Sequence, residues 1–172
     1  FQRGDPAPSD PHLSHIYGLA LPLLKRGLPI TPVQLENVTV PHYLDVFRVL
    51  LLSYHGQKPQ TPEVHTPLAE WVKRGGALVV IDDDTDPYNR VREWWNSDGH
   101  SYTTPREHLF EQLGFTGNQR APEGKLVKVG KGAVLWLREN PAKLASNAAG
   151  DERIVETTKL AAKRAGLRWR ES

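Results

Sequence analysis

One unbroken apolar run, Ala77–Ile81, restricts most strongly what this chain can fold into. It shows no alternation of polar and apolar residues, which is typical of a strand covered on both faces. Gly75–Gly76 precedes it and can adopt the left-handed conformation that ends a helix. Three aspartates, Asp82–Asp84, follow it. Because ligands of open α/β sheets lie beyond the carboxyl ends of the strands, we expect any site near these aspartates.

Helical and strand patterns alternate along most of the chain. Another strand is predicted over Phe47–Leu52, which contains the most apolar tetrad of the chain, Val49–Leu52. Leu126–Val129 with Ala133–Leu137 predicts a hairpin before a final amphipathic helix. This order predicts an α/β fold with three layers, a mostly parallel flavodoxin-like sheet and a late β-hairpin. A length of 172 residues suits a single domain, residues 1–172.

Three further elements are expected around this framework. A helix is predicted to begin at Asp10 and to end at Gly27, and a strand interrupted by a proline is predicted over Ile30–Leu35. Asp86 before a proline predicts the start of a helix that runs to about Asn96. Doubly wound domains usually begin with a strand, whereas this chain opens with a helix, so we expect it to be excised from a longer chain.

Composition excludes several classes of function. The chain has no cysteine, which excludes disulfides, thiolate catalysis and cysteine-ligated zinc within it. The net charge is +2 and basic residues are dispersed, so we expect neither nucleic acid nor a membrane as a partner. Absence of cysteine fits oxidising and reducing compartments equally, so the localisation is left open. The absence of methionine adds to the expectation of a processed or excised chain.

Three motifs, in this order, carry a family resemblance: Leu24–Ile30, Leu68–Val79 and Val129–Leu137. Together they resemble the class I glutamine amidotransferase-like superfamily, and most closely the non-catalytic, trimerisation-type domains of β-galactosidase-like glycoside hydrolases. In active members the strand that matches Ala77–Ile81 leads to a nucleophilic cysteine, and Asp82 follows that strand here. A carboxylate cannot replace the thiolate, so glutamine amidotransfer is excluded. The resemblance therefore implies an accessory role without catalytic residues.

The aspartates Asp82, Asp83, Asp84 and Asp86 have two interpretations. Their carboxylates could bind Ca²⁺ or Mg²⁺. Alternatively, Asp86 caps the following helix and the others are solvated turn residues. The glycine and distal glutamate of an EF-hand loop are absent, and no metal ligand or cofactor is assigned. A separate pair, His12 and His15, lacks the third ligand of a zinc site.

Polar residues also follow the strand predicted over Phe47–Leu52. Ser53 and His55 are expected at the same edge of the sheet as the aspartates. One could combine serine, histidine and aspartate into a hydrolase triad, but Ser53 lacks the Gly-x-Ser-x-Gly elbow. We therefore assign Ser53, His55 and Asp82–Asp84 as candidate ligand-binding residues, without a catalytic role.

Aromatic residues surround the polar segment from Ser97 to Thr104. Tyr88, Trp94 and Trp95 are candidate interface residues, since exposed aromatic faces dock partner domains or stack on sugar rings. The simpler alternative is that one tryptophan packs in the core and the other covers a helix end.

The sequence thus leads to two hypotheses. The first is a non-catalytic accessory or interaction domain of a larger, carbohydrate-active protein, whose partners are other domains of that protein, a second copy of the chain, or carbohydrate. The second is a free-standing hydrolase or small-ligand-binding protein that uses the carboxyl edge of the sheet.

Overall fold

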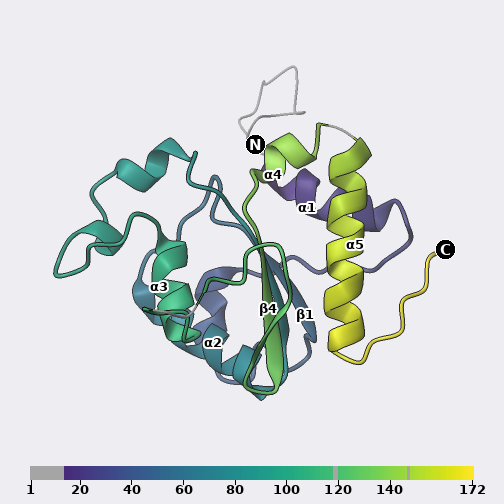
Figure 1. Cartoon of the computed structure of the whole chain (residues 1–172), viewed down its shortest axis with the longest axis horizontal. Coiled ribbons are helices and arrows are strands. Elements are labelled where there is room, and N and C mark those ends of the chain that lie inside the picture. The colour runs from purple at the N-terminus through teal and green to yellow at the C-terminus, as the bar shows by residue number, and fades with distance from the viewer. Residues whose placement is uncertain (1–13, 118–119, 147) are drawn as a thin grey trace.

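A four-stranded mixed sheet forms the centre of the fold (Figure 1). The computed structural model describes residues 14–117, 120–146 and 148–172. The strands lie in the order β1, β2, β4, β3, with β1–β2 and β2–β4 parallel and β3–β4 antiparallel. Their bounds are β1 Val49–Leu52, β2 Ala77–Ile81, β3 Val127–Val129 and β4 Gly132–Leu137. The late β-hairpin is therefore confirmed.

Helices cover both faces of this sheet, which gives three layers. Helices α2 and α3 lie on one face, and α5 lies on the other with α1 and α4 packed against it (Figure 1). The helices are α1 Ser14–Leu24, α2 His65–Arg74, α3 Pro105–Gln112, α4 Pro141–Leu144 and α5 Ala148–Arg164. The three-layer α/β fold with a mostly parallel sheet agrees with the expectation from sequence.

Alternate residues of the central strands supply two separate cores. Val80 of β2 and Trp136 of β4 pack toward α2, whereas Val79 and Leu135 pack toward α5. Every residue of β2 is buried, which explains why its sequence is apolar throughout. At the end of the hairpin, a Cβ on Gly132 would lie 2.0 Å from the carbonyl oxygen of Val72, so only glycine permits this approach of α2.

The predicted strand over Ile30–Leu35 is wrong. Residues 28–34 have no regular secondary structure, and a short 3₁₀ helix, η1 Leu35–Thr39, follows them. Val33 and Leu35 pack against the core, but Ile30 and Pro32 are exposed and the segment pairs with no strand of the described sheet, so no ladder of hydrogen bonds holds it as a strand.

The predicted helix from Pro87 to Asn96 is also wrong. Two 3₁₀ turns occupy that segment, η3 Pro87–Arg90 and η4 Trp94–Asn96. The side chain of Asp86 does cap the first turn, accepting a hydrogen bond from the backbone N–H of Tyr88 at 2.9 Å. The expected start of the first helix at Asp10 lies outside the described residues. None of the described helices is long and apolar enough to cross a membrane.

Candidate functional site

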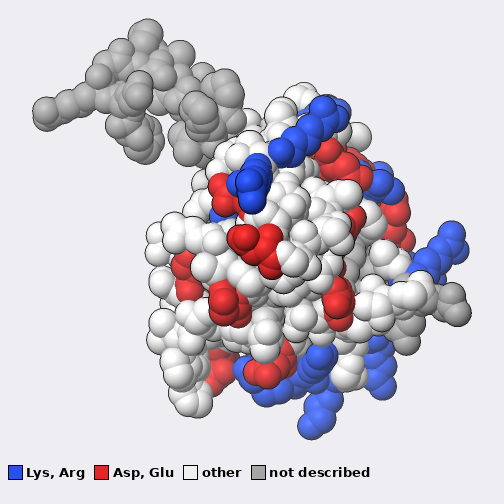
Figure 2. All heavy atoms as spheres, turned by 90° about the vertical axis from the view of Figure 1, so that its left-hand side faces the viewer, with Lys and Arg blue, Asp and Glu red and all other residues white. Residues whose placement is uncertain are grey.

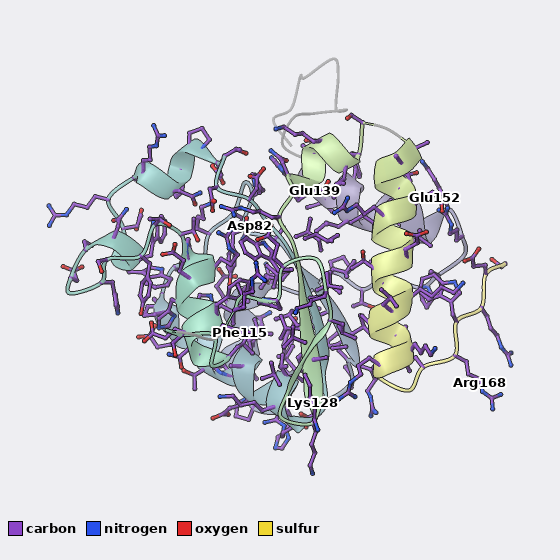
Figure 3. The ribbon with its side chains drawn as sticks, viewed as in Figure 1. Asp82, Phe115, Lys128, Glu139, Glu152 and Arg168 are labelled. Carbon is purple, nitrogen blue, oxygen red and sulfur yellow. The ribbon has the colours of Figure 1, made fainter. Side chains whose placement is uncertain are left out.

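The carboxyl edge of the sheet brings the predicted polar residues together. Asp82 lies at this end of the sheet in Figure 3, and Lys128 lies at the opposite end. The parallel register of β1 with β2 places the residues after Leu52 next to those after Ile81. His55 and Asp83, which lie 28 positions apart in the chain, are consequently in direct contact.

His55 is fixed by a carboxylate pair. Its ring Nε2 lies 2.8 Å from Oδ1 of Asp83 and 3.8 Å from Oδ1 of Asp82. The ring of His15 stacks on His55 at a centroid distance of 5.4 Å. Only 2% of the His55 side chain is exposed, so the imidazole is held within the protein and is not presented to solvent. His12, the other member of the predicted histidine pair, lies outside the described residues.

Two arginines hold the remaining carboxylates in an ion-pair chain. Arg106, from the first turn of α3, donates to Asp82 and to Asp84, each at 2.6 Å. Arg138, just after β4, donates to the second oxygen of Asp84 at 2.5 Å. The Arg106 guanidinium also lies 4.3 Å from the centroid of the Trp136 ring, a cation–π distance. The charges of Asp82 and Asp84 are therefore compensated by protein cations.

The charge of Asp86 is also compensated by a protein cation. Lys58 donates to its Oδ2 at 2.6 Å, while its Oδ1 caps the η3 turn. Among the described residues, no group of three or more histidine, aspartate or glutamate side chains is arranged to hold a metal ion. The aspartates of this edge are engaged with cationic side chains and backbone donors instead.

Ser53 does not complete a catalytic triad in this arrangement. Its Oγ accepts a hydrogen bond from the backbone N–H of His55 at 3.2 Å, which is a local turn contact. Asp83 contacts Nε2 of His55, so in a catalytic triad the other ring nitrogen, Nδ1, would have to contact the serine oxygen. The contact of the Ser53 oxygen is with the backbone N–H of His55 instead.

Burial raises the pKa values of these carboxylates, and hydrogen bonding lowers them. Burial raises the pKa of Asp82, opposed by the charges of Arg106 and His55. Partial burial of Asp84 is outweighed by the hydrogen bonds from Arg106 and Arg138, so the pKa of Asp84 is lowered. The pKa of Asp83 is lowered in the same way, by hydrogen bonds from Thr85 and His55. Asp83 and Asp84 are thus stabilised as carboxylates.

A buried hydrogen-bond chain runs beside this edge. The Tyr54 hydroxyl lies 2.7 Å from Nε2 of His65, and Nδ1 of His65 lies 2.8 Å from Nδ1 of His108. Burial raises the pKa of Tyr54 well above its usual value and lowers the pKa of His65 to about 3. Both are therefore neutral near pH 7. A neutral imidazole carries one ring hydrogen, so His65 donates through one of these two contacts and accepts through the other.

The predicted interface aromatics have different environments. Trp95 is 1% exposed, and its indole N–H donates to the carbonyl of Asn89 at 3.0 Å. Trp94 is half-buried and donates to the carbonyl of Pro59 at 2.8 Å. Tyr88 is 47% exposed. Of the three, Tyr88 presents the most surface for an intermolecular contact.

A hollow of about 300 Å³ opens next to Asp84, on the segment between β2 and α3. Most of its lining residues carry polar groups, but most of its exposed wall is apolar, and Tyr102 contributes an aromatic ring. The lining residues are Asp84, Asn89, Arg90, Asn96, Tyr102, Thr103 and Thr104. Of the predicted ligand-binding residues, Asp84 lines this hollow. The side chains of Asp82 and His55 are buried and do not line it.

The sequence did not predict the basic residues that contact these carboxylates. Arg106, Arg138 and Lys58 lie 22 to 54 positions from the carboxylates that they contact. No local pattern connects residues at such separations. The one usable local signal is Thr104–Pro105, because proline is common at the first position of a helix, and Arg106 lies in the first turn of α3.

Comparisons with protein-family models, with curated proteins and with solved structures found no match for this chain.

Proposed function

We propose that the chain is a non-catalytic accessory domain of a larger, carbohydrate-active protein, which acts by contact with other domains of that protein or with a second copy of itself. The observation that carries the proposal is the bridging of Asp82 and Asp84 by Arg106. A general base needs a carboxylate or imidazole that can reach a substrate proton. Here Asp82 and Asp84 face protein cations, Asp83 accepts hydrogen bonds from Thr85, and the His55 side chain is almost completely buried. The carbohydrate context rests on the family resemblance.

The exposed face of α1 supports an interaction role. This helix buries Gly18 and Leu23 against its neighbours, while four large apolar side chains remain exposed on its outer side. They are Ile16 (59% exposed), Tyr17 (38%), Leu21 (38%) and Leu24 (49%). Adjacent exposed apolar side chains on one helix are typical of a contact surface. This surface, and not the tryptophans, is the strongest candidate interface among the described residues.

The alternative function comprises two possibilities, a hydrolase and a protein that binds a small ligand. A hydrolase is disfavoured because Ser53 bonds to the backbone of His55 and not to its ring. A role in binding a small ligand is supported only by the hollow beside Asp84, which is lined by several polar residues and opens to solvent. An accessory domain can also bind a ligand, so this part does not compete with the proposal.

Sedimentation velocity over a range of protein concentrations tests the interaction role. We expect self-association that Leu24→Asp weakens by about tenfold, because a charge in the α1 surface must be desolvated on contact. Val46→Asp is the control, since Val46 is an apolar residue that is still more accessible (79% exposed) but lies in the loop before β1. If the chain is monomeric throughout, the partner must be another domain, and α1 should then be protected from hydrogen exchange within the longer protein.

Turnover assays test the absence of catalysis. We expect no hydrolysis of aryl esters, aryl amides or aryl glycosides by the chain. Turnover that the His55→Gln variant abolishes would show that the buried imidazole is catalytic, and the accessory role would have to be abandoned.

A further inference from the structure

Six basic side chains gather at the amino edge of the sheet, opposite the edge that carries the aspartates. Figure 3 labels one of them, Lys128, at this end of the molecule, and Figure 2 shows basic side chains along the lower margin of an adjacent face. All six residues are exposed. They are Arg48, Lys73, Lys128, Lys131, Lys163 and Arg164, and we call them the basic edge.

The fold brings these residues together from elements that are far apart in the chain. The N–H of Lys131, in the β3–β4 turn, donates to the carbonyl of Lys73 at the end of α2, at 2.9 Å. The side chain of Arg164, in the last turn of α5, donates to the carbonyl of Lys131 at 3.0 Å. Arg48 precedes β1, and its carbonyl accepts from the N–H of Ala77, at the start of β2, at 3.0 Å. Basic residues that are dispersed in the sequence therefore share one edge of the structure.

The chain itself does not neutralise these charges. Among the described residues, no carboxylate forms an ion pair with any side chain of the basic edge. The neighbouring Arg74 forms one, with Asp45 at 3.7 Å. At the carboxyl edge, by contrast, Lys58, Arg106 and Arg138 are each paired with an aspartate. An uncompensated positive potential consequently remains at the amino edge.

Helix dipoles explain only part of this cluster. Lys73 lies in the last turn of α2, and Lys163 and Arg164 lie in the last turn of α5, where a cation meets the negative end of a helix favourably. The other three residues lie outside the helices, before β1 and in the β3–β4 hairpin. Like charges that are brought together repel each other, so their concentration lowers stability and favours a role in binding an anionic partner.

Exposed apolar side chains lie beside these charges. Leu160 is 53% exposed and lies one turn before Lys163 and Arg164, on the same face of α5. Leu167 is 46% exposed, and its N–H donates to the carbonyl of Ala162 at 2.9 Å, which holds it next to the last turn of the helix. A surface that combines basic and aliphatic side chains suits a protein partner, because protein interfaces bury apolar area as well as charge.

We propose that the basic edge docks an acidic segment of a partner protein. The carboxylates of that segment contact the lysines and arginines, and its apolar side chains pack on Leu160 and Leu167. This surface is separate from the exposed face of α1, so the contact does not depend on self-association through that helix.

Other anions fit this surface less well. The helices α2 and α5 end here and direct carbonyl groups to this edge, whereas anions bind at the N–H groups of helix N-termini. Single-stranded nucleic acids stack their bases on aromatic rings, but the exposed side chains of Leu160 and Leu167 are aliphatic. A duplex would extend beyond the edge onto the adjacent face, where scattered acidic side chains repel phosphates (Figure 2).

Fluorescence anisotropy with a short labelled peptide, in which leucines are interspersed among glutamates, tests this proposal. We expect saturable binding that weakens as the salt concentration rises, because salt screens exposed charges. The double variant Lys128→Glu with Lys131→Glu should weaken binding by about tenfold or more, since it places like charges opposite the peptide. The matched control is Arg90→Glu with Arg92→Glu, which changes the net charge equally at two exposed residues between β2 and α3.

Two altered peptides separate charge from apolar contact. A peptide with glutamine in place of glutamate should not bind. A peptide of the same charge without leucine should bind the wild-type chain about tenfold more weakly, because it buries less apolar surface. The variant Leu160→Ser should reduce this difference between the two acidic peptides.

Four outcomes would overturn the proposal. The first is the absence of saturable binding of the leucine-containing acidic peptide. Equal weakening by the two double variants, each checked for folding by circular dichroism, would assign the binding to overall charge. Equal affinity for the acidic peptides with and without leucine would reduce the edge to a general site for polyanions. Tighter binding of a single-stranded or duplex oligonucleotide than of the peptide would make the edge a nucleic-acid surface. None of these outcomes bears on the contact role of α1, which is tested separately by sedimentation.

Discussion

Arg106 and Asp82 form an ion pair in which both side chains are buried. The guanidinium Nη1 lies 2.6 Å from Oδ2 of the carboxylate, and the two side chains are 4% and 2% exposed. Two charges removed from water in this way are tolerated only as a pair, since each compensates the desolvation of the other. Burial still raises the pKa of Asp82, so the pairing offsets the desolvation of this carboxylate only in part.

Replacement of one partner should therefore be costly. Arg106→Met leaves Asp82 buried without its cation, and we expect the free energy of unfolding to fall by about 3–5 kcal/mol. The double variant Asp82→Asn with Arg106→Met should recover part of this loss, because no uncompensated charge remains. Urea denaturation of the two variants measures both values. Unchanged stability of Arg106→Met would show that water reaches Asp82 readily.

The low pKa of His65 makes stability depend on pH in a specific window. The folded-state pKa is about 3 and the usual value is 6.5, so the unfolded chain binds the proton first as the pH falls. The contribution of neutral His65 is therefore complete above pH 6.5 and is lost progressively toward pH 3. Between pH 7 and pH 5 the loss should be about 2 kcal/mol.

The variant His65→Gln isolates this contribution. Glutamine, like neutral histidine, offers both a donor and an acceptor, but it does not titrate. We expect its free energy of unfolding to change by about 2 kcal/mol less between pH 7 and pH 5 than that of the wild type. The pKa values of Asp83 and Asp84 are lowered, so these groups lose their contributions at lower pH, in both proteins. Parallel pH profiles would indicate that the pKa of His65 is the same in the folded and the unfolded chain.

Thr104→Val should stabilise the chain. The hydroxyl of Thr104 has no described partner and is buried, so its replacement by a methyl group removes an unsatisfied polar group at nearly constant volume. We expect a gain of about 1 kcal/mol in thermal or urea unfolding. The neighbouring Thr103→Val is the control and should lose stability, because the Thr103 hydroxyl donates to Glu107 at 2.5 Å. A loss at Thr104 would reveal a bound water that satisfies the hydroxyl.

Gly18→Ala tests the packing of α1 on α4. In an isolated helix this change gains about 1 kcal/mol, because alanine has the higher helix propensity. Here a Cβ on Gly18 would lie 2.0 Å from the carbonyl oxygen of Pro141, so we expect a net loss of about 1–3 kcal/mol. Ala20→Gly in the same helix measures propensity alone and should lose about 1 kcal/mol. A net gain for Gly18→Ala would show that α4 moves aside at little cost.

Errors of prediction fell where tertiary contacts outweigh local pattern. The apolar run Ala77–Ile81 was sufficient to identify β2, since burial on both faces demands such a run. Ile30–Leu35 has a strand-like composition, but it has no neighbouring strand in the described sheet. The segment from Pro87 to Asn96 was expected to be helical, yet the side chain of Asn96 bonds to the carbonyls of Asn89 and Val91, which favours turns over a continuous helix.

At the candidate site, too, local sequence predicted some features and tertiary contacts decided the others. The positions of Asp82, Asp83, Asp84 and His55 at one edge followed from the sequence, because residues after parallel strands meet at the carboxyl edge of a sheet. Their partners did not follow from it. Whether a carboxylate binds a metal, a ligand or an arginine depends on which side chain a distant element brings within about 3 Å.

The sequence by itself determined the α/β class, the buried strand β2, the late hairpin and the absence of thiol chemistry, since each depends on residue type or on short-range periodicity. The tertiary structure alone decided that Arg106 bridges Asp82 and Asp84, that Trp95 is buried, and that Asn89 and Thr104 line one hollow. The physical reason is that these contacts join residues far apart in the chain. Only the docking of α3 and of the segment before it against the sheet brings their side chains together.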